Sequence, residues 1–324
     1  QQTKDYKDKM SKVQKEVNKA IENMFKSDTF KRYLEVVAAF PKYSFNNVMM
    51  IVSQKPDATM VQGYKAWQKY GRQVQKGEKG LKIFAPTFKK MEMTKLDPKT
   101  QKPMTDNKGN EITEKKEVLT GFRLVNVFDV SQTKGKELVT ARDFIKGDLQ
   151  ESDRIKDLYV KLMDHLNQNT KFNAKEEDLG DPSLGGYYRP ADDSIRVNAQ
   201  EKNTSMKFKT LIHEYAHGQL HHKESDMKDL PRGHKEAQAE AVAFSVSKYY
   251  GLNTDQYSAG YIAHWSRDIN LARQALSEIQ QVASRTIQEI DGLMKDRIKE
   301  FQNTHQKKGS QEKKQEPSQK SEHK

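Results

Sequence analysis

The sequence contains no cysteine and no long apolar run. The absence of cysteine excludes a disulfide scaffold, a Cys-ligated zinc finger and a cysteine nucleophile, and it fits a reducing cytoplasm. No stretch approaches the ~20 apolar residues that cross a bilayer, so we expect a cytoplasmic protein with no membrane partner. The first ten residues are charged and lack the apolar core of a signal peptide. The sequence begins with Gln1 rather than Met, which leaves open a processed chain or a piece of a longer one.

Positive charge is abundant and unevenly placed. The 324 residues suit two domains and carry a net charge of +12. Residues 1–90 hold 19 Lys and Arg against 8 Asp and Glu, whereas residues 151–300 hold 21 against 24. Such asymmetry suggests two units with different partners, the basic one being a candidate for binding a polyanion. The alternative is a lysine-rich surface that only contacts solvent.

The first half is expected to be α+β. Apolar residues recur at helical spacing over residues 4–40, with a break near residue 27, and again over 44–53. The apolar run at 81–85 and the alternating run at 119–130 predict two strands of a hairpin. The polar stretch between them, residues 89–117, is expected to be an exposed insertion.

The second half is expected to be mainly helical, with a small sheet. A domain boundary falls near residues 135–150, and a short strand is expected at 195–198. From Gln302 the chain is polar enough to predict a disordered Lys/Gln-rich tail over 302–324. Helices are expected at 151–169, 203–222, 234–250, 255–267 and 269–301.

The most specific motif is His213-Glu214-x-x-His217. Two histidines four residues apart lie side by side on a helix, so their imidazoles can share one Zn²⁺. Glu214, adjacent to the first of them, is placed to take a proton from a bound water. The sequence therefore predicts a metal site with Glu214 as the catalytic residue.

A catalytic zinc needs a third protein ligand. Glu236 and Glu240 lie one turn apart in an alanine-rich stretch whose small side chains allow close helix packing. We expect Glu236 to be the third ligand and Glu240 to orient a ligand histidine. The reverse assignment stays open, and His221, His222 and His234 are alternative ligands that better suit a helix end. The strand expected at 195–198 is a candidate edge strand for pairing with a peptide substrate.

Motifs in both halves resemble ArdC-like antirestriction proteins of conjugative plasmids and mobile elements. In the first half they are Tyr43-Ser44-Phe45-Asn46-Asn47, Gly63-Tyr64-Lys65-Ala66-Trp67, Gly71-Arg72, Lys76-Gly77-Glu78-Lys79-Gly80, Ala85-Pro86 and 127–133. In the second half they are Gly185-Gly186-Tyr187-Tyr188, 213–217, 236–240 and 261–265. The insertion at 89–117 and the tail after residue 302 depart from the pattern.

The resemblance implies three segments: a basic single-stranded DNA-binding domain at 1–140, a zincin-like metallopeptidase domain at 141–301, and the tail. It also supports Glu236 as the metal ligand. The implied cofactor is one catalytic-type Zn²⁺, with Mn²⁺ as an alternative, and the implied role is to protect transferred DNA from host restriction.

Single-strand binding needs aromatic platforms beside cations, and the first half supplies both. For Phe45 and Trp67 a place in the core is favoured, whereas for Tyr43, Lys76 and Lys79 contact with DNA is favoured. The candidate DNA contacts are Tyr43, Asn46, Asn47, Trp67, Arg72, Lys76 and Lys79.

Two other functions stay open at this point. The chain can be a single-stranded DNA-binding protein whose zinc domain is structural or catalytically idle. It can also be a zincin that cleaves a regulatory protein, in which case duplex DNA would be preferred over single strands. Whether any peptide or protein is cleaved does not follow from the residues.

Overall fold

The computed structural model describes residues 29–138, 153–254 and 267–296, together with residues 17–23 and single positions at 11, 15, 265, 299 and 303. Their packing divides the chain into two compact units. We call Val61–Lys134 the ribbon unit, and Gln1–Met60 with Gly135–Lys324 the helical unit. Both contain helices and strands, which confirms the expected α+β class. Among the helices that the structure describes, none is both long and apolar enough to span a bilayer.

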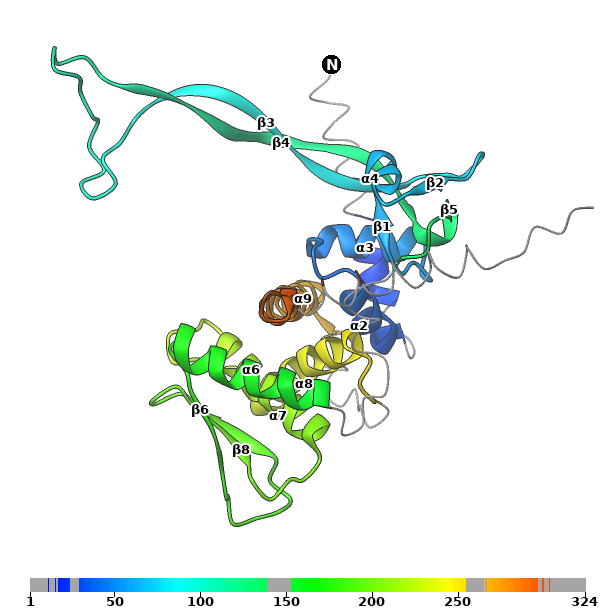
Figure 1. Ribbon diagram of the computed structural model, residues 1–324, viewed down its shortest axis with the longest axis vertical. Coiled ribbons are helices and arrows are strands. Elements are labelled where there is room, and N and C mark those ends of the chain that lie inside the picture. The colour runs from blue at the N-terminus through cyan, green and yellow to red at the C-terminus, as the bar shows by residue number, and fades with distance from the viewer. Residues whose placement is uncertain are drawn as a thin grey trace, which may run out of the picture. The chain divides into compact units, whose positions relative to one another are not determined.

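The ribbon unit is built on one long hairpin (Figure 1). Strands β3 (Leu81–Thr94) and β4 (Thr113–Asp129) pair antiparallel, which confirms the predicted hairpin and extends it into the expected insertion. The tip between the strands is ordered by two bridges, Leu96 with Pro103 and Thr105 with Glu111. The remaining elements are β1 (Val61–Gln62), which pairs with β4, helix α4 (Tyr64–Lys69), and β2 (Arg72–Val74), which pairs with β5 (Thr133–Gly135).

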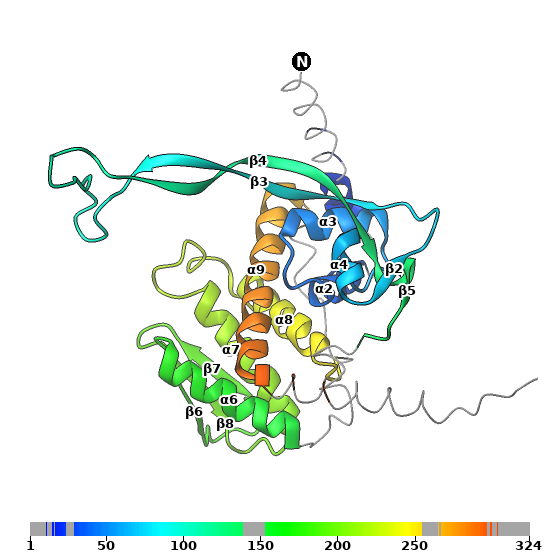
Figure 2. The same ribbon diagram turned by 45° about the horizontal axis from the view of Figure 1, so that its top comes forward.

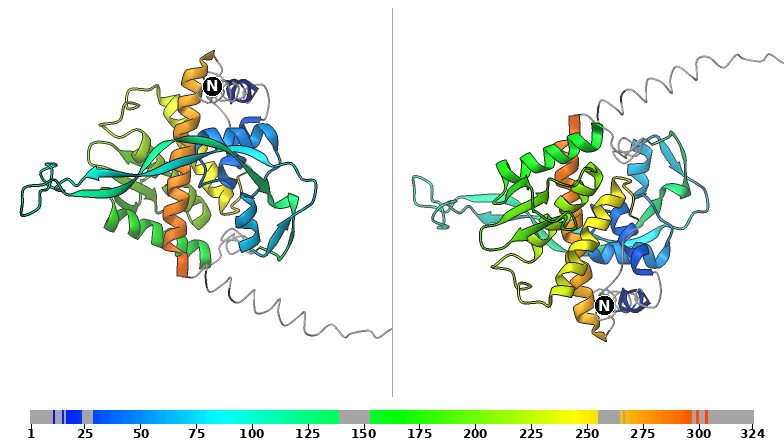
Figure 3. Two further views of the ribbon diagram at one scale, coloured as in Figure 1. Left: turned by 90° about the horizontal axis from the view of Figure 1, so that it is seen from above. Right: turned by 90° about the horizontal axis from the view of Figure 1, so that it is seen from below.

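The described part of the helical unit contains six labelled helices, a further helical stretch at residues 17–23, and one three-stranded sheet (Figure 2). The sheet, β6 (Asn173–Glu177), β7 (Gly186–Arg189) and β8 (Ser194–Asn198), packs against α7. The long helix α9 lies against α8, as Figure 3 shows. The six helices are α2 (Thr29–Ala39), α3 (Phe45–Gln54), α6 (Asp153–Asn169), α7 (Thr204–Leu220), α8 (Arg232–Tyr249) and α9 (Ile269–Leu293).

The packing does not follow a single boundary near residue 140. Helix α2 packs on α8 and α9, and α3 packs on α9. The buried Tyr33 hydroxyl donates to the Leu276 carbonyl oxygen at 3.0 Å, and the Lys248 ammonium lies 3.3 Å from the Glu35 carboxylate. The apolar side of α2 thus completes the core of the later helices, so cutting the chain at residue 140 would expose it. Residues 139–152, most of 255–267 and the tail after 303 lie outside the described residues.

The expectation that strand 195–198 is an edge strand is wrong. Strand β8 is central in the sheet order β6-β8-β7, pairing parallel with β6 and antiparallel with β7. All five of its residues are buried, with both neighbouring strands and α7 covering them. Sequence order placed this strand just before α7 but did not reveal that both of its edges are paired. Among the described residues, β6 and β7 are the outer strands of the sheet.

Gly218, directly after His217 in α7, is required by close packing. A Cβ atom at this position would lie 2.4 Å from Phe172 Cε1 and 2.8 Å from Phe172 Cζ. We expect Gly218→Val to lower the free energy of unfolding by about 1–3 kcal/mol, because the buried Phe172 ring has to move. The measurement is urea unfolding of the full chain. Gly292→Val is the matched control, since a Cβ there meets nothing within 4 Å, and an equal loss in both variants would contradict this account.

Candidate metal centre

Helix α7 positions the three residues of the central motif. The helix begins after Asn203, whose side-chain oxygen accepts from the Met206 N–H at 3.1 Å. One side of it is anchored by buried apolar residues, namely Phe208, Leu211, Ile212, Tyr215 and Leu220. His213 and His217 follow at i, i+4, with ring centroids 4.8 Å apart. A rigid, buried helix therefore presents both imidazoles side by side.

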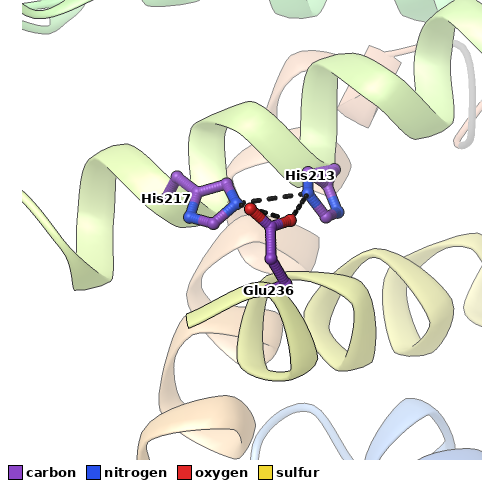
Figure 4. Close-up of side chains that lie close together, drawn as sticks. All are labelled: His213, His217 and Glu236. Atoms are coloured by element: carbon purple, nitrogen blue, oxygen red, sulfur yellow. Dashed lines mark hydrogen bonds and ion pairs between the residues drawn. The ribbon is translucent and has the colours of Figure 1, made fainter. Parts of the chain in front are cut away.

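Helix α8 brings a carboxylate to the two histidines (Figure 4). Four alanines at 237, 239, 241 and 243 keep α8 close to α7. The Glu236 Oε2 atom lies 3.3 Å from His213 Nε2 and 3.5 Å from His217 Nε2, and the two Nε2 atoms are 3.2 Å apart. The contacts with both histidines hold the pKa of Glu236 well below its usual range.

The donor atoms fit one divalent ion. Ligand atoms about 2.0–2.2 Å from a tetrahedral ion lie roughly 3.3–3.6 Å from one another, and the three distances in this cluster are 3.2, 3.3 and 3.5 Å. Two nitrogens and one oxygen also match the donor set of catalytic zinc sites. The residues present therefore suit a metal of this class.

Glu240 contacts the ring nitrogen of His213 that faces away from the cluster. The Glu240 Oε2 atom lies 3.3 Å from His213 Nδ1, and its Oε1 atom pairs with the Lys209 ammonium at 3.0 Å. Burial opposes charge on His213, but its contacts with Glu236 and Glu240 prevail and raise its pKa to about 9. Glu236 thus faces the ligand side of His213 and Glu240 faces the other nitrogen, the geometry in which Glu240 orients a ligand.

His217 has an outer partner that the sequence reasoning missed. The His217 and His221 Nδ1 atoms are 2.9 Å apart, His221 Nε2 is 3.0 Å from Gln238 Oε1, and the Gln238 amide donates to the Glu278 carboxylate at 2.8 Å. Burial lowers the pKa of His221 to about 4, so this ring is neutral. If His217 Nε2 faces a metal, its Nδ1–H donates to His221, whose Nε2–H then donates to Gln238. The signal in the sequence was the i, i+4 spacing of His217 and His221.

Glu214 lies in a largely dehydrated position beside the sheet. Its exposed fraction is 8%, and burial raises the pKa of its carboxyl group. The backbone N–H of Tyr188, in strand β7, faces this carboxylate and partly opposes the rise in its pKa. A carboxylate with a raised pKa can accept a proton and later release it near neutral pH.

His222 and His234, the remaining alternative ligands, stand outside the cluster. His234 is buried at the start of α8, where its Nδ1 atom accepts from the Trp265 indole N–H at 3.0 Å. His222 follows the end of α7. Among the described residues, the group that can hold a metal is His213, His217 and Glu236.

The candidate DNA contacts divide between the two units. In the helical unit, Asn46 is exposed, Tyr43 is half-buried and Asn47 is buried inside the first turn of α3. Tyr43 lies in a loop tied to α9, because the Gln280 amide donates to its carbonyl oxygen and the Gln288 amide donates to that of Pro41.

In the ribbon unit, Lys76 and Lys79 are exposed, whereas Arg72 is half-buried. The Arg72 guanidinium donates to the Thr133 hydroxyl at 2.8 Å and to the Thr133 carbonyl oxygen at 3.1 Å, so it joins β2 to β5. The Gln132 amide donates to the Lys79 carbonyl oxygen and to the Glu78 carboxylate, both at 2.9 Å. These bonds fix the turn that carries both lysines.

Trp67 belongs to the core of the ribbon unit. Its side chain is fully buried and its indole N–H donates to the Phe128 carbonyl oxygen at 2.9 Å, so neither ring face can stack on a base in this conformation. We expect Trp67→Ala to lower the free energy of unfolding by about 3–5 kcal/mol. Urea unfolding followed by circular dichroism measures this, with exposed Gln68→Ala as control. A Trp67→Ala variant that keeps its stability but loses DNA affinity would show that Trp67 contacts DNA directly.

The first part of the chain is similar to a known protein family. Residues 4–128 match the family described as the N-terminal domain of anti-restriction factor ArdC. An uncharacterized protein of Bacillus anthracis, pXO2-81, is 29% identical over 348 aligned positions covering 96% of this chain, and the chain spans 57% of that relative's length.

Two solved structures of the antirestriction ArdC protein from plasmid R388 are also similar. The metal-free structure matches with a TM-score of 0.42 and 21% identity, over 77% of this chain and 85% of that one. The Mn(II)-bound structure matches with a TM-score of 0.39 and 20% identity, over 76% and 84%.

Proposed function

We propose that this chain, whose residues 4–128 match the family described as the N-terminal domain of anti-restriction factor ArdC, is an antirestriction protein that binds single-stranded DNA and carries a metal-dependent peptidase site. The observation that carries the peptidase part is the convergence of His213, His217 and Glu236 on one point. The proposed cofactor is one Zn²⁺ ion, with Mn²⁺ as the alternative. The proposed division of labour assigns DNA binding to residues 1–140 and the metal site to residues 141–301.

Single-strand binding is supported by the charge of the ribbon unit. Residues 61–134 contain 16 Lys and Arg against 8 Asp and Glu. Lys76 and Lys79 are exposed on a turn whose backbone is fixed by Gln132. A basic surface of this kind attracts the phosphate backbone without reading sequence, and its affinity falls as salt rises.

In the proposed peptidase reaction, His213, His217 and Glu236 hold the metal and Glu214 moves the proton. The bound ion would supply a Lewis acid and acidify water. Glu214 accepts a proton as the water oxygen bonds to the scissile carbonyl carbon. It then returns that proton to the nitrogen as the carbon–nitrogen bond breaks, so the products are a carboxylic acid and an amine. Its burial suits this exchange, because it brings the carboxyl pKa nearer to neutral.

The edge strand β7 is the proposed binding place for a peptide. Among the described residues it pairs with β8 alone, and its Tyr188 N–H faces the Glu214 carboxylate. An extended peptide can add to such an edge through main-chain hydrogen bonds. β7, rather than the strand at 195–198, is therefore the proposed edge strand for pairing with a peptide.

The test uses the full chain, because α2 and α3 are packed into the helical unit. We expect one metal ion per chain by mass spectrometry after loading with Zn²⁺ or Mn²⁺, and tighter binding of oligo-dT than of a duplex of equal length. A chain that takes up no metal would contradict the peptidase part. A preference for duplex DNA would favour the alternative in which a regulatory protein is cleaved.

A further inference from the structure

The ribbon unit contains an open groove next to the turn that carries Lys76. Its volume is about 580 Å³. It lies where α4, β2 and β5 come together, an arrangement visible in Figure 2. The lining residues are Tyr64, Gln73, Val74, Gln75, Lys76, Glu78, Phe128 and Lys134. Of these, Lys76 is one of the DNA contacts expected from the sequence, and Tyr64 stands in one of the motifs that carry the resemblance.

Tyr64 gives this groove a fixed aromatic wall. Its hydroxyl accepts a hydrogen bond from the Gln73 side-chain amide at 2.5 Å, and its ring meets Phe128 edge to face at a centroid distance of 6.4 Å. The side chain is nevertheless 44% exposed. A tyrosine that is held at both ends and open on a face loses little conformational entropy when a flat ring stacks on it.

Two ammonium groups stand in the same groove. Lys76 and Lys134 are both exposed. The one carboxylate of the lining, Glu78, is engaged by the Gln132 amide at 2.9 Å. An aromatic wall beside a net positive charge is the chemistry that recognises a nucleotide, with the base on the ring and the phosphate near the ammonium groups.

An exposed aromatic face continues from the groove along the ribbon. On β4, Phe128, Leu124 and Phe122 are separated by even numbers of residues, so they share one face. The register places Phe84 opposite Leu124 and Pro86 opposite Phe122. We call this the aromatic face, and its most exposed members are Phe88 (54%), Leu119 (50%), Phe122 (45%) and Leu124 (36%).

A register shift extends this face. The pairing moves by one residue between Thr87 and Phe88, so that Phe88 is opposite Leu119 rather than Thr120. Without the shift, Leu119 would turn to the other face of β4. Lys82 and Lys90 have the same strand parity as Phe88, so one lysine lies on the aromatic face on each side of the rings, and Lys90 is opposite Glu117. Lysine is depleted at protein–protein interfaces. Exposed rings with lysines beside them instead match a polyanion that carries flat bases.

We propose that single-stranded DNA binds the ribbon unit by placing one base on Tyr64 in the groove and continuing along the aromatic face. Phosphates lie near Lys76 and Lys134. The inference rests on the proposed DNA-binding function and names the residues that perform it. Through Lys90, the expected insertion at 89–117 also contributes to this contact surface.

The first test compares two tyrosines of equal exposure. Tyr64 is 44% exposed and lines the groove, while Tyr70 is 46% exposed at the end of the same helix and does not. For the full chain and fluorescent oligo-dT, we expect Tyr64→Ala to weaken binding by roughly 10-fold or more. Tyr70→Ala should change it less than about 2-fold. Equal losses in both variants would overturn the groove as the site.

The second test addresses the aromatic face. Phe122 (45% exposed) lies on it, whereas Met93 (46% exposed) lies on the opposite face of the ribbon. We expect Phe122→Ala, but not Met93→Ala, to weaken binding of an oligonucleotide of about twelve nucleotides. The difference should vanish with about three nucleotides, which fill only the groove. Equal affinity of both variants for the long oligonucleotide would overturn the continuation along the ribbon.

The third test counts phosphates. Replacing Lys76 and Lys134 together by Ala should reduce the slope of log affinity against log salt by about 1.4, since each single-strand phosphate contact contributes about 0.7. Replacing Lys65 and Lys69, exposed on α4 outside the groove, is the matched control. A wild-type chain that binds no oligo-dT would refute the proposed DNA-binding function itself. Binding that all of these substitutions leave unchanged would refute only the site.

Discussion

Replacing Glu214 by Gln is expected to lower peptide hydrolysis by about 10²–10⁴-fold while the chain keeps its metal. Glu214 is the acid/base of the proposed reaction and is not among the three convergent donors. Gln preserves the volume of the side chain but cannot accept and return a proton. The measurement is cleavage of an unstructured peptide library by the metal-loaded full chain, followed by mass spectrometry, with metal content determined on the same samples.

The control for this prediction is Glu224→Gln, an exposed carboxylate after the end of α7. It should leave both cleavage and metal content unchanged. Cleavage by Glu214→Gln at the wild-type rate would contradict the proposed mechanism. A Glu214→Gln variant that still protects transferred DNA from restriction would show that DNA binding alone delivers the function, which is the alternative with an idle metal domain.

Among substitutions around the cluster, Glu236→Ala is expected to weaken metal binding most, by more than about 100-fold. It removes one of three ligand atoms, whereas substitution of a residue behind a ligand histidine typically costs 10–100-fold. We expect this smaller loss for Glu240→Ala, which frees His213 Nδ1, and for His221→Ala, which frees His217 Nδ1. Competition with a chromogenic chelator for Zn²⁺ measures all three affinities.

The relative losses of metal affinity in Glu236→Ala and Glu240→Ala show which of the two carboxylates is the third ligand, a question that the sequence left open. A larger loss in Glu240→Ala than in Glu236→Ala would exchange the roles of the two carboxylates. Glu224→Ala serves as the control for a general loss of negative charge. Circular dichroism of each metal-free variant separates a lost ligand from a misfolded helix, because a ligand loss leaves the helical content unchanged.

The central site was open to prediction because its spacing is local. In one helix, residues four apart share a face whatever surrounds it, so His213 and His217 could be paired from the sequence alone. The alanine-rich stretch indicated a close helix contact, and Glu236 was expected as the third donor. His221 was assigned to a helix end, since the sequence does not show that Gln238 and Glu278 stand behind it.

The DNA contacts were harder to predict, because composition does not distinguish a buried aromatic ring from an exposed one. Trp67 and Tyr64 are three residues apart in the same motif, yet the first is fully buried and the second is 44% exposed. Phe88 directly precedes the expected insertion at 89–117 and Phe122 follows it, and neither was expected to contact DNA. Only the register of β3 and β4 places them on one face with Phe84.

The sequence by itself determined the α+β class, the main helices, the hairpin, the concentration of positive charge in the first ninety residues, and the pairing of His213 with His217. Each of these follows from residue type and short-range periodicity. The tertiary structure alone decided that α2 and α3 complete the core of α8 and α9, that β8 is central while β7 is an edge, and that Trp67 is core. Periodicity shows which side of an element is apolar, but the element that covers that side is chosen by packing across long stretches of chain.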